Sequence, residues 1–242
     1  GAAAGGGGGL AGIHQSPPHS PSRGSGPGGG GGRRQLFTAF VPDHLVQHMM
    51  GQPDEIRPQS HFFQAVCLCC DISGFTRLSE RHAQKGADGL DALVRLINGY
   101  MSQLINAIYL LEGDIMKIAG DAFFCLFKAR PGEGSLRPAA LRAAKCGLVL
   151  KEVATPDLTV HVGAAKGEVC FACLGGYDWR YDCLISGEPI ELVAVAMEEA
   201  KSKECVLSAE LHALVVEAAE GRRLPSGNFL LEDLDSHTVA SR

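Results

Sequence analysis

The chain has 242 residues, of which 45% are hydrophobic and 20% charged, with a formal net charge of −5. This composition is typical of about one folded globular domain and excludes a wholly disordered chain. The negative charge, without a basic stripe, argues against a nucleic-acid partner. No apolar run approaches the roughly 18 residues of a membrane-spanning helix, so we expect a soluble protein.

The first segment, 1–34, is rich in Gly, Ala, Pro and Ser and buries too little apolar surface to fold, so we expect it to be disordered. The folded domain is expected over 36–220. Apolar residues around Pro42-Asp43 predict a short helix packed on that domain. The segment 221–242 is expected to be a weakly anchored tail or the start of a linker, with one strand at 229–231 at most.

The short, continuous apolar run 65–70 predicts a buried strand, although periodicity alone does not exclude a buried helix. Asp71 stands where this strand leaves the core. Ser73-Gly74 then predicts a tight turn, and a helix is expected over 75–83. A carboxylate beside a helix N-terminus can hold a hard cation, while free N–H groups face phosphate oxygens. The alternative is that Asp71 is an ordinary turn or N-cap residue.

A second carboxylate lies further along the chain. A long apolar stripe from Leu90 to Ile108 at helical spacing predicts a crossover helix. The stretch 113–127 predicts two strands joined by a tight turn at Gly120-Asp121, which places Asp121 at a hairpin tip. If this hairpin pairs beside the first strand, Asp71 and Asp121 converge. Two carboxylates together with substrate phosphates are a minimal set of ligands for Mg²⁺.

The rest of the chain alternates between helical and strand patterns. The order of elements favours an α/β (α+β) fold in which helices cover a mainly antiparallel sheet. A turn is expected at Gly167-Glu168, between two strands. The expected strands are 158–164, 169–174, 181–185 and 204–207, and the expected helices are 136–153, 188–201 and 209–219, the last capped by Ser208.

Nine cysteines occur without a secretory signal. We expect them to be free thiols in a reducing, cytoplasmic compartment. Cys170 and Cys173 have the spacing of metal ligands, but we do not expect a zinc site, because the other cysteines, including those of the predicted strand 65–70, lie in apolar segments.

Two motifs together resemble a known family. Asp-Ile-Ser-Gly-Phe-Thr at 71–76, followed by Gly-Asp-Ile-Met-Lys-Ile-Ala-Gly-Asp-Ala at 113–122, resembles the class III nucleotidyl cyclase catalytic domain. Phe-Val-Pro-Asp-His-Leu-Val at 40–46 is similar to its bicarbonate-responsive, soluble adenylyl cyclase branch. The resemblance extends from about Leu36 to about Ala218. It implies a ferredoxin-like core and the conversion of ATP to cyclic AMP and pyrophosphate in intracellular signalling.

The resemblance also implies roles for individual residues. Asp71 and Asp121 would hold two Mg²⁺ ions, for which Mn²⁺ can substitute, with help from the backbone carbonyl of Ile72. The terminal phosphates of ATP would bind the backbone N–H groups at the start of the helix expected over 75–83. Those groups belong to Ser73, Gly74, Phe75 and Thr76.

Active sites in this family form between two cyclase domains, and the partner face supplies an Asn and an Arg from one helix. The matching positions here are Ile190 and Ala194, which cannot replace them. The chain is therefore expected to be a half-site that needs a second class III cyclase domain and is weak or inactive alone. The alternative is a non-catalytic, cyclase-like regulatory domain.

Two basic residues have weaker roles in this interpretation. Lys117 matches a lysine of a purine or bicarbonate pocket, but that pocket also uses an Arg, and its position is Ala194, which argues against bicarbonate binding. Lys117 is otherwise an ordinary solvated lysine at a strand end. His161 is a weak candidate for phosphate binding, or else a strand histidine exposed beside the sheet.

Overall fold

The structure, a computed structural model, describes residues 41–50, 59–177 and 180–235. The expected disorder of 1–34, and the parts of the domain and tail at 36–40 and 236–242, lie outside the described residues. No helix within the described ranges is long and apolar enough to cross a membrane.

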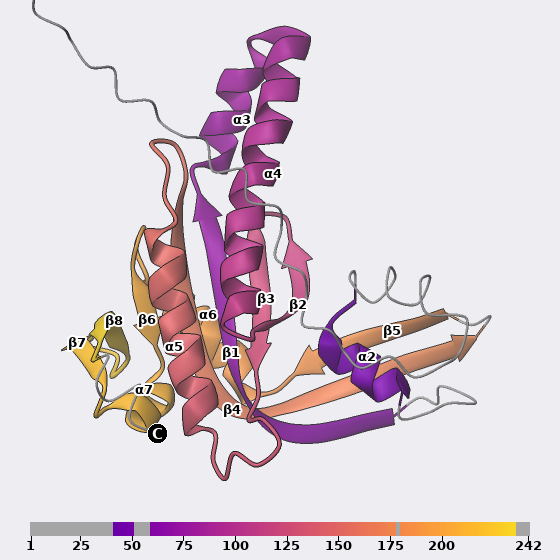
Figure 1. Ribbon diagram of the computed structural model, residues 1–242, viewed down its shortest axis with the longest axis vertical. Helices are drawn as coiled ribbons and strands as arrows, with labels where there is room; N and C mark the ends of the chain where they lie inside the picture. Colours follow the sequence, from indigo (N-terminus) through magenta and orange to yellow (C-terminus); the bar gives the residue numbers. More distant parts are fainter. Residues whose placement is uncertain (1–40, 51–58, 178–179, 236–242) are drawn as a thin grey trace, which may run out of the picture.

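An eight-stranded sheet forms the centre of the described molecule (Figure 1). Along the sheet the strands follow the order β2-β3-β1-β4-β6-β8-β7, and β5 pairs with β4. Neighbouring strands are antiparallel except for β4 and β6. The expected mainly antiparallel sheet is therefore confirmed. The strands are β1 (Gln59–Ser73), β2 (Asp114–Ala119), β3 (Ala122–Phe127), β4 (Thr159–Tyr177), β5 (Arg180–Ser186), β6 (Cys205–Leu207), β7 (Ala219–Arg223) and β8 (Phe229–Leu234).

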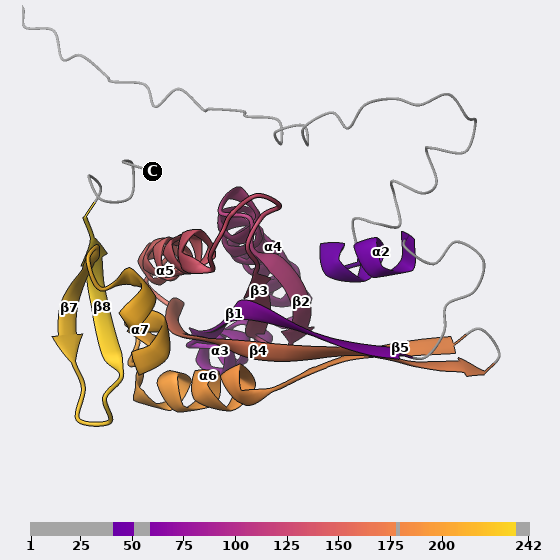
Figure 2. The same ribbon diagram turned by 90° about the horizontal axis from the view of Figure 1, so that it is seen from below.

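Helices cover both faces of this sheet (Figure 2), so the expected helical cover is confirmed as well. Alternation along β1 explains the two layers, because successive side chains of a strand point to opposite faces. Val66, Leu68 and Cys70 belong to the larger core, under α4 and α5, whereas Ala65 and Cys67 belong to a second core, under α6. The helices are α2 (Asp43–Met50), α3 (Phe75–Ala83), α4 (Gly86–Leu110), α5 (Arg137–Glu152), α6 (Glu188–Glu199) and α7 (Ala209–Val215).

The predicted crossover helix exists as α4, but only part of its apolar stripe is core. Leu93, Leu104 and Ile108 are buried, whereas Leu90 and Val94 are 57% and 49% exposed. The first turns of α4 project with α3 beyond the end of the sheet, so their apolar side chains have no strand to cover (Figure 1).

The prediction of a turn at Gly167-Glu168 is wrong. Strand β4 continues through these two residues, and Gly167 pairs with Ala65 of β1. A Cβ atom on Gly167 would lie 2.9 Å from Cδ of Pro189, at the start of α6. Glycine in this strand therefore permits the close approach of a helix and does not end the strand.

After Gly221 the described residues are not the weakly anchored tail that was expected, although the strand expected at 229–231 is present as part of β8. β7 and β8 form a hairpin, and β8 pairs with β6 within the main sheet. Phe229, Leu230 and Leu231 are buried. Alternation did not indicate β7 because four of its five residues are exposed.

An arm of three strands extends away from the helix-covered core (Figure 2). We define the arm as residues 59–64 of β1, 167–177 of β4 and all of β5. Helix α2 lies over it, and the ring of His44 packs 4.7 Å from the rings of both Phe63 and Phe171. The carboxylate of Asp114 accepts hydrogen bonds from the backbone N–H groups of Asp43 and His44, both at 2.8 Å. These contacts join α2 to both the arm and strand β2, which carries Asp114.

His44 is buried in its neutral form. The ammonium of Lys128 lies 2.6 Å from Nδ1 of His44 and can only donate, so Nε2 of His44 carries the proton and faces Nε2 of His61 at 3.1 Å. Burial, followed by the charges of Lys128, His61 and His48, lowers the pKa of His44 to about 4. Burial also lowers the pKa of His61.

Stability is expected to fall as pH decreases from 7 to 5. In the unfolded chain His44 has a pKa near 6.5, so unfolding in this range takes up a proton that the folded state excludes. The loss from His44 alone is about 2 kcal/mol across these two pH units. Urea unfolding of the native chain and His44→Gln at pH 7, 6 and 5 measures it. Equal pH slopes for the two proteins would contradict the prediction.

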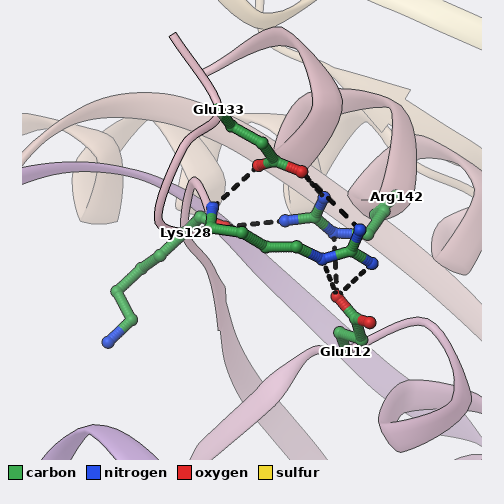
Figure 3. A network of polar contacts seen from close by, with 5 residues as sticks. Glu112, Lys128, Glu133 and Arg142 are labelled. Carbon is green, nitrogen blue, oxygen red and sulfur yellow. Dashed lines mark hydrogen bonds and ion pairs between the residues drawn. The ribbon is translucent and has the colours of Figure 1, made fainter. Parts of the chain in front are cut away.

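A charged network holds the loop between β3 and α5 (Figure 3). Arg142 of α5 donates to Glu133 at 2.8 Å and to the backbone carbonyl of Lys128 at 2.7 Å. Arg130 donates from Nε to Glu112 at 2.6 Å, just after α4. The side chains of Arg142 and Glu133 are only 15% and 16% exposed, so this part of the network is more than a surface ion pair. It fixes the C-terminal end of β3, while Asp121 precedes the other end of the same strand.

Candidate active site at the ends of β1 and the β2–β3 hairpin

The first carboxylate lies within the sheet. β1 continues past the expected end of the strand at residue 70, and Asp71 pairs with Ala122 of β3 on one side and His161 of β4 on the other. The side chain of Asp71 is 33% exposed, so it is reachable from solvent although its strand is central. Ile72, next in the chain, is buried in the larger core.

The second carboxylate lies at the tip of the β2–β3 hairpin. Only Gly120 and Asp121 separate the two strands, and Gly120 has φ of 67°, as the first residue of a type II′ turn requires. Asp121 immediately precedes Ala122, the partner of Asp71. The hairpin therefore pairs beside β1, and the two carboxyl groups come together.

The two carboxyl groups affect each other electrostatically. Burial raises the pKa of Asp71, and the neighbouring charge of Asp121 raises it further, while His161 opposes both effects. Like charges this close are unfavourable unless a cation lies between them. Carboxylate pairs of this kind are the ligands that Mg²⁺ and Mn²⁺ prefer, so the donor set fits a hard divalent ion. Within the described residues no group of three or more His, Cys, Asp or Glu side chains is arranged for a metal, so further ligands would be backbone, water or substrate oxygens.

His161 lies beside Asp71. Its Nε2 atom is 3.8 Å from a carboxylate oxygen of Asp71, and its Nδ1 atom is 3.3 Å from the hydroxyl of Ser73. It is half-buried rather than simply exposed beside the sheet. A protonated His161 would place positive charge next to the carboxylate pair.

Helix α3 begins directly after these residues, with the expected bounds of 75–83. Gly74 precedes it with φ of 98° and has no side chain to cap the first N–H groups. The first turn of a helix leaves such groups without intrahelical acceptors. The start of α3 therefore offers N–H donors near the carboxylate pair, and Leu78 is the buried residue that holds α3 on the core.

A residue that the sequence did not indicate determines this turn. A Cβ atom on Gly74 would lie 2.2 Å from the backbone carbonyl oxygen of Asp157. The side chain of Asp157 also accepts a hydrogen bond from Arg81 of α3 at 2.5 Å. Asp157 lies 76 residues from Arg81 in the chain and in no motif, so no sequence signal pointed to it.

The remaining candidates make no contact with the carboxylate pair among the interactions of the described residues. Lys117 is exposed on β2 and pairs with Phe124 next to a register shift in the ladder. On α6, Ile190 packs against the second core, while Ala194 is exposed. Thus α6 presents no hydrogen-bonding side chain at either position.

Comparisons with known proteins agree with this architecture. Residues 59–220 match the family model of the adenylate and guanylate cyclase catalytic domain. Adenylate cyclase type 10 of Oryctolagus cuniculus is 28% identical over 181 residues and that of Rattus norvegicus 30% over 181 residues. Each alignment covers 71% of this chain but 11% of the relative.

A solved structure gives the same fold. The adenylyl cyclase CyaB from P. aeruginosa superimposes with a TM-score of 0.59 at 22% identity, covering 74% of this chain and 98% of that one. At this identity the likeness concerns the fold alone. The family match covers well over half of the chain and contains both carboxylates. The chain therefore belongs to the family of adenylate and guanylate cyclase catalytic domains.

Proposed function

We propose that this chain is the metal-binding half of an adenylyl cyclase site, which converts ATP to cyclic AMP and pyrophosphate together with a second cyclase domain. The observation that carries the proposal is the meeting of Asp71 and Asp121 beside the N-terminus of α3. ATP is preferred to GTP in this proposal because the similar curated proteins are adenylate cyclases.

In this proposal Asp71, Asp121 and the backbone carbonyl of Ile72 hold two Mg²⁺ ions. When bound, such ions make the 3′-hydroxyl of ATP a better nucleophile and offset the charge on the departing pyrophosphate. The positions of the two carboxylates would determine where the ions, and so their positive charge, lie. The backbone N–H groups of Ser73–Thr76 orient the terminal phosphates at the start of α3. His161 adds a positive charge on the same side when protonated.

The need for a second domain follows from α6. Ile190 and Ala194 offer no side-chain donor at the positions where the family resemblance implies an Asn and an Arg. Groups that stabilise developing charge in a transition state are commonly worth about 100- to 1,000-fold in rate. A second copy of this chain would lack them too. The same observation favours the alternative, a cyclase-like regulatory domain that binds Mg²⁺ and nucleotide without turnover.

The proposed setting is cytoplasmic cyclic-nucleotide signalling. It is supported by nine cysteines that are all free thiols, as expected where the cell keeps thiols reduced. The proposal does not include bicarbonate activation, since Ala194 has no positive charge to bind that anion.

Cyclic AMP formation with Mn²⁺ and ATP tests the proposal. The chain is assayed alone, and mixed with a second cyclase domain of the soluble type that carries the Asn and Arg. We expect turnover only in the mixture, and a parallel assay with GTP measures purine preference. A folded chain that binds Mn²⁺ and ATP yet gives no product in any mixture would favour the regulatory alternative.

A further inference from the structure

Two cysteines face each other across the arm. Cys173 of β4 pairs directly with Cys183 of β5, and their Sγ atoms are 3.8 Å apart, with the Cys183 thiol donating to Cys173. Neither residue belongs to the proposed active site. Both thiols are free in the structure.

Side-chain rotation and a small approach of the two strands separate this contact from a covalent bond. Directly opposed residues of antiparallel strands have Cβ atoms about 4.5–5.5 Å apart, while a disulfide needs about 3.5–4.5 Å. The sulfurs would have to approach by about 1.8 Å to reach the S–S bond length of about 2.0 Å. Because Cys173 and Cys183 are already in register, β4 and β5 need not slide.

The two thiols differ in accessibility. Cys173 is 1% exposed and lies on the central strand of the arm, opposite Gln59 of β1. Cys183 lies on β5 and is half-buried, so solutes reach its sulfur first. Cys170 is three residues before Cys173 and points to the other face of the strand, where Ser186 is its partner. Cys170 is therefore a natural control.

We infer that Cys173 and Cys183 are a redox-modification site that closes reversibly to a disulfide and joins β5 covalently to β4. The oxidant is a low-molecular-weight disulfide, RS–SR. The Cys183 thiolate attacks one sulfur of RS–SR, and one RS⁻ leaves. Cys173, losing its proton, attacks the Cys183 sulfur of the mixed disulfide, and the second RS⁻ leaves. Both leaving groups take up a proton, so the protein loses two electrons and two RSH form.

The chemistry of Cys183 sets the speed of this reaction. Burial, followed by the contact with Cys173, raises the pKa of the Cys183 thiol to about 12. The thiolate is therefore scarce at neutral pH. Closure should accelerate about tenfold for each unit of pH between 7 and 9, because only the thiolate attacks.

Closure would change a defined part of the arm. The β4–β5 ladder shifts register between Gly175 and Tyr177, just beyond Cys173. A disulfide at the Cys173–Cys183 pair fixes the strands on the core side of this irregularity. Opening of β5 away from β4 then requires reduction first. Backbone amides of 182–186 should exchange with solvent more slowly in the oxidised protein.

Peptide mapping tests the inference on the full chain. The protein is equilibrated in buffers of oxidised and reduced glutathione at pH 8, then alkylated and digested with trypsin. Cys173 falls in peptide 167–180 and Cys183 in peptide 181–201, so closure yields these two peptides linked. We expect the link in the native chain and equally in Cys170→Ser, with loss in Cys173→Ser or Cys183→Ser. Circular dichroism checks that each variant is folded.

Linked peptides that persist in Cys170→Ser and revert in reduced glutathione support the inference. The inference is overturned if folded Cys170→Ser never gives the link, or if Cys183 ends as a stable glutathione adduct beside an alkylated Cys173. The native chain and Cys170→Ser keep both reacting thiols, so the result does not depend on whether Cys173→Ser folds.

Discussion

Replacing Asp71 or Asp121 by Asn is expected to lower cyclic AMP formation in the two-domain mixture about a thousandfold. Asparagine keeps the size of the side chain but removes the negative charge, and metal ions contribute several kcal/mol of charge stabilisation to such reactions. The measurement is the initial rate with Mn²⁺ and saturating ATP. Isothermal titration with Mn²⁺ in the same proteins should show weaker binding.

Stability separates this loss from misfolding. Burial and the charge of Asp121 both raise the pKa of Asp71, which means that the ionised form of Asp71 is disfavoured in the folded protein. Asp71→Asn should therefore unfold in urea no earlier than the native chain when no metal is added. Asp88→Asn, an exposed acid in the first turn of α4, is the matched control and should keep its rate. Retention of more than a tenth of the rate in both Asp71→Asn and Asp121→Asn would contradict the two-carboxylate site.

Gly74→Ala is expected to cause the largest loss of stability near the site, more than about 3 kcal/mol. Alanine at a φ of 98° costs roughly 1–2 kcal/mol through backbone strain alone. Its Cβ would also lie 2.2 Å from the carbonyl oxygen of Asp157, which forces α3 or the 155–158 segment to move. Urea unfolding measures the loss, and Mn²⁺-ATP binding should weaken with it because the start of α3 shifts.

Gly86→Ala separates the two causes. Gly86 also has a positive φ, 70°, but nothing lies within 4 Å of where its Cβ would be. Strain without collision should cost only about 1–2 kcal/mol. Equal losses for Gly74→Ala and Gly86→Ala would show that contact with Asp157 does not constrain the turn.

Local patterns were sufficient where one segment determines its own structure. The bounds of α3 and the two-residue turn at Gly120-Asp121 follow from the sequence and were found as predicted. The pairing of the β2–β3 hairpin beside β1 depends on contacts beyond the hairpin itself, and the register of Asp71 with Ala122 shows that this pairing forms.

Contacts between distant segments were not predictable from these patterns. Gly167 has the same local signature whether it ends a strand or lets Pro189 approach, and only the packing of α6 decides between the two. Strand β7 lacks an alternating pattern in the sequence. The β7–β8 hairpin joins the sheet because β8 pairs with β6, a contact between distant segments. The close approach of the Asp157 carbonyl to Gly74 and the hydrogen bonds from α2 to Asp114 likewise depend on folding the whole chain.

The continuity of β1 and β4 has a mechanical consequence. Their ladder runs from Gln59–Cys173 in the arm to Ser73–Thr159 beside Asp71, and its register does not shift anywhere. At about 3.3 Å per residue, the 15 residues of β1 extend about 50 Å along the strand. Because no bulge interrupts this ladder, the arm cannot change its register against β4 independently of the residues beside Asp71. One unbroken pair of strands thus carries the arm at one end and Asp71 near the other, and passes through the helix-covered core between them.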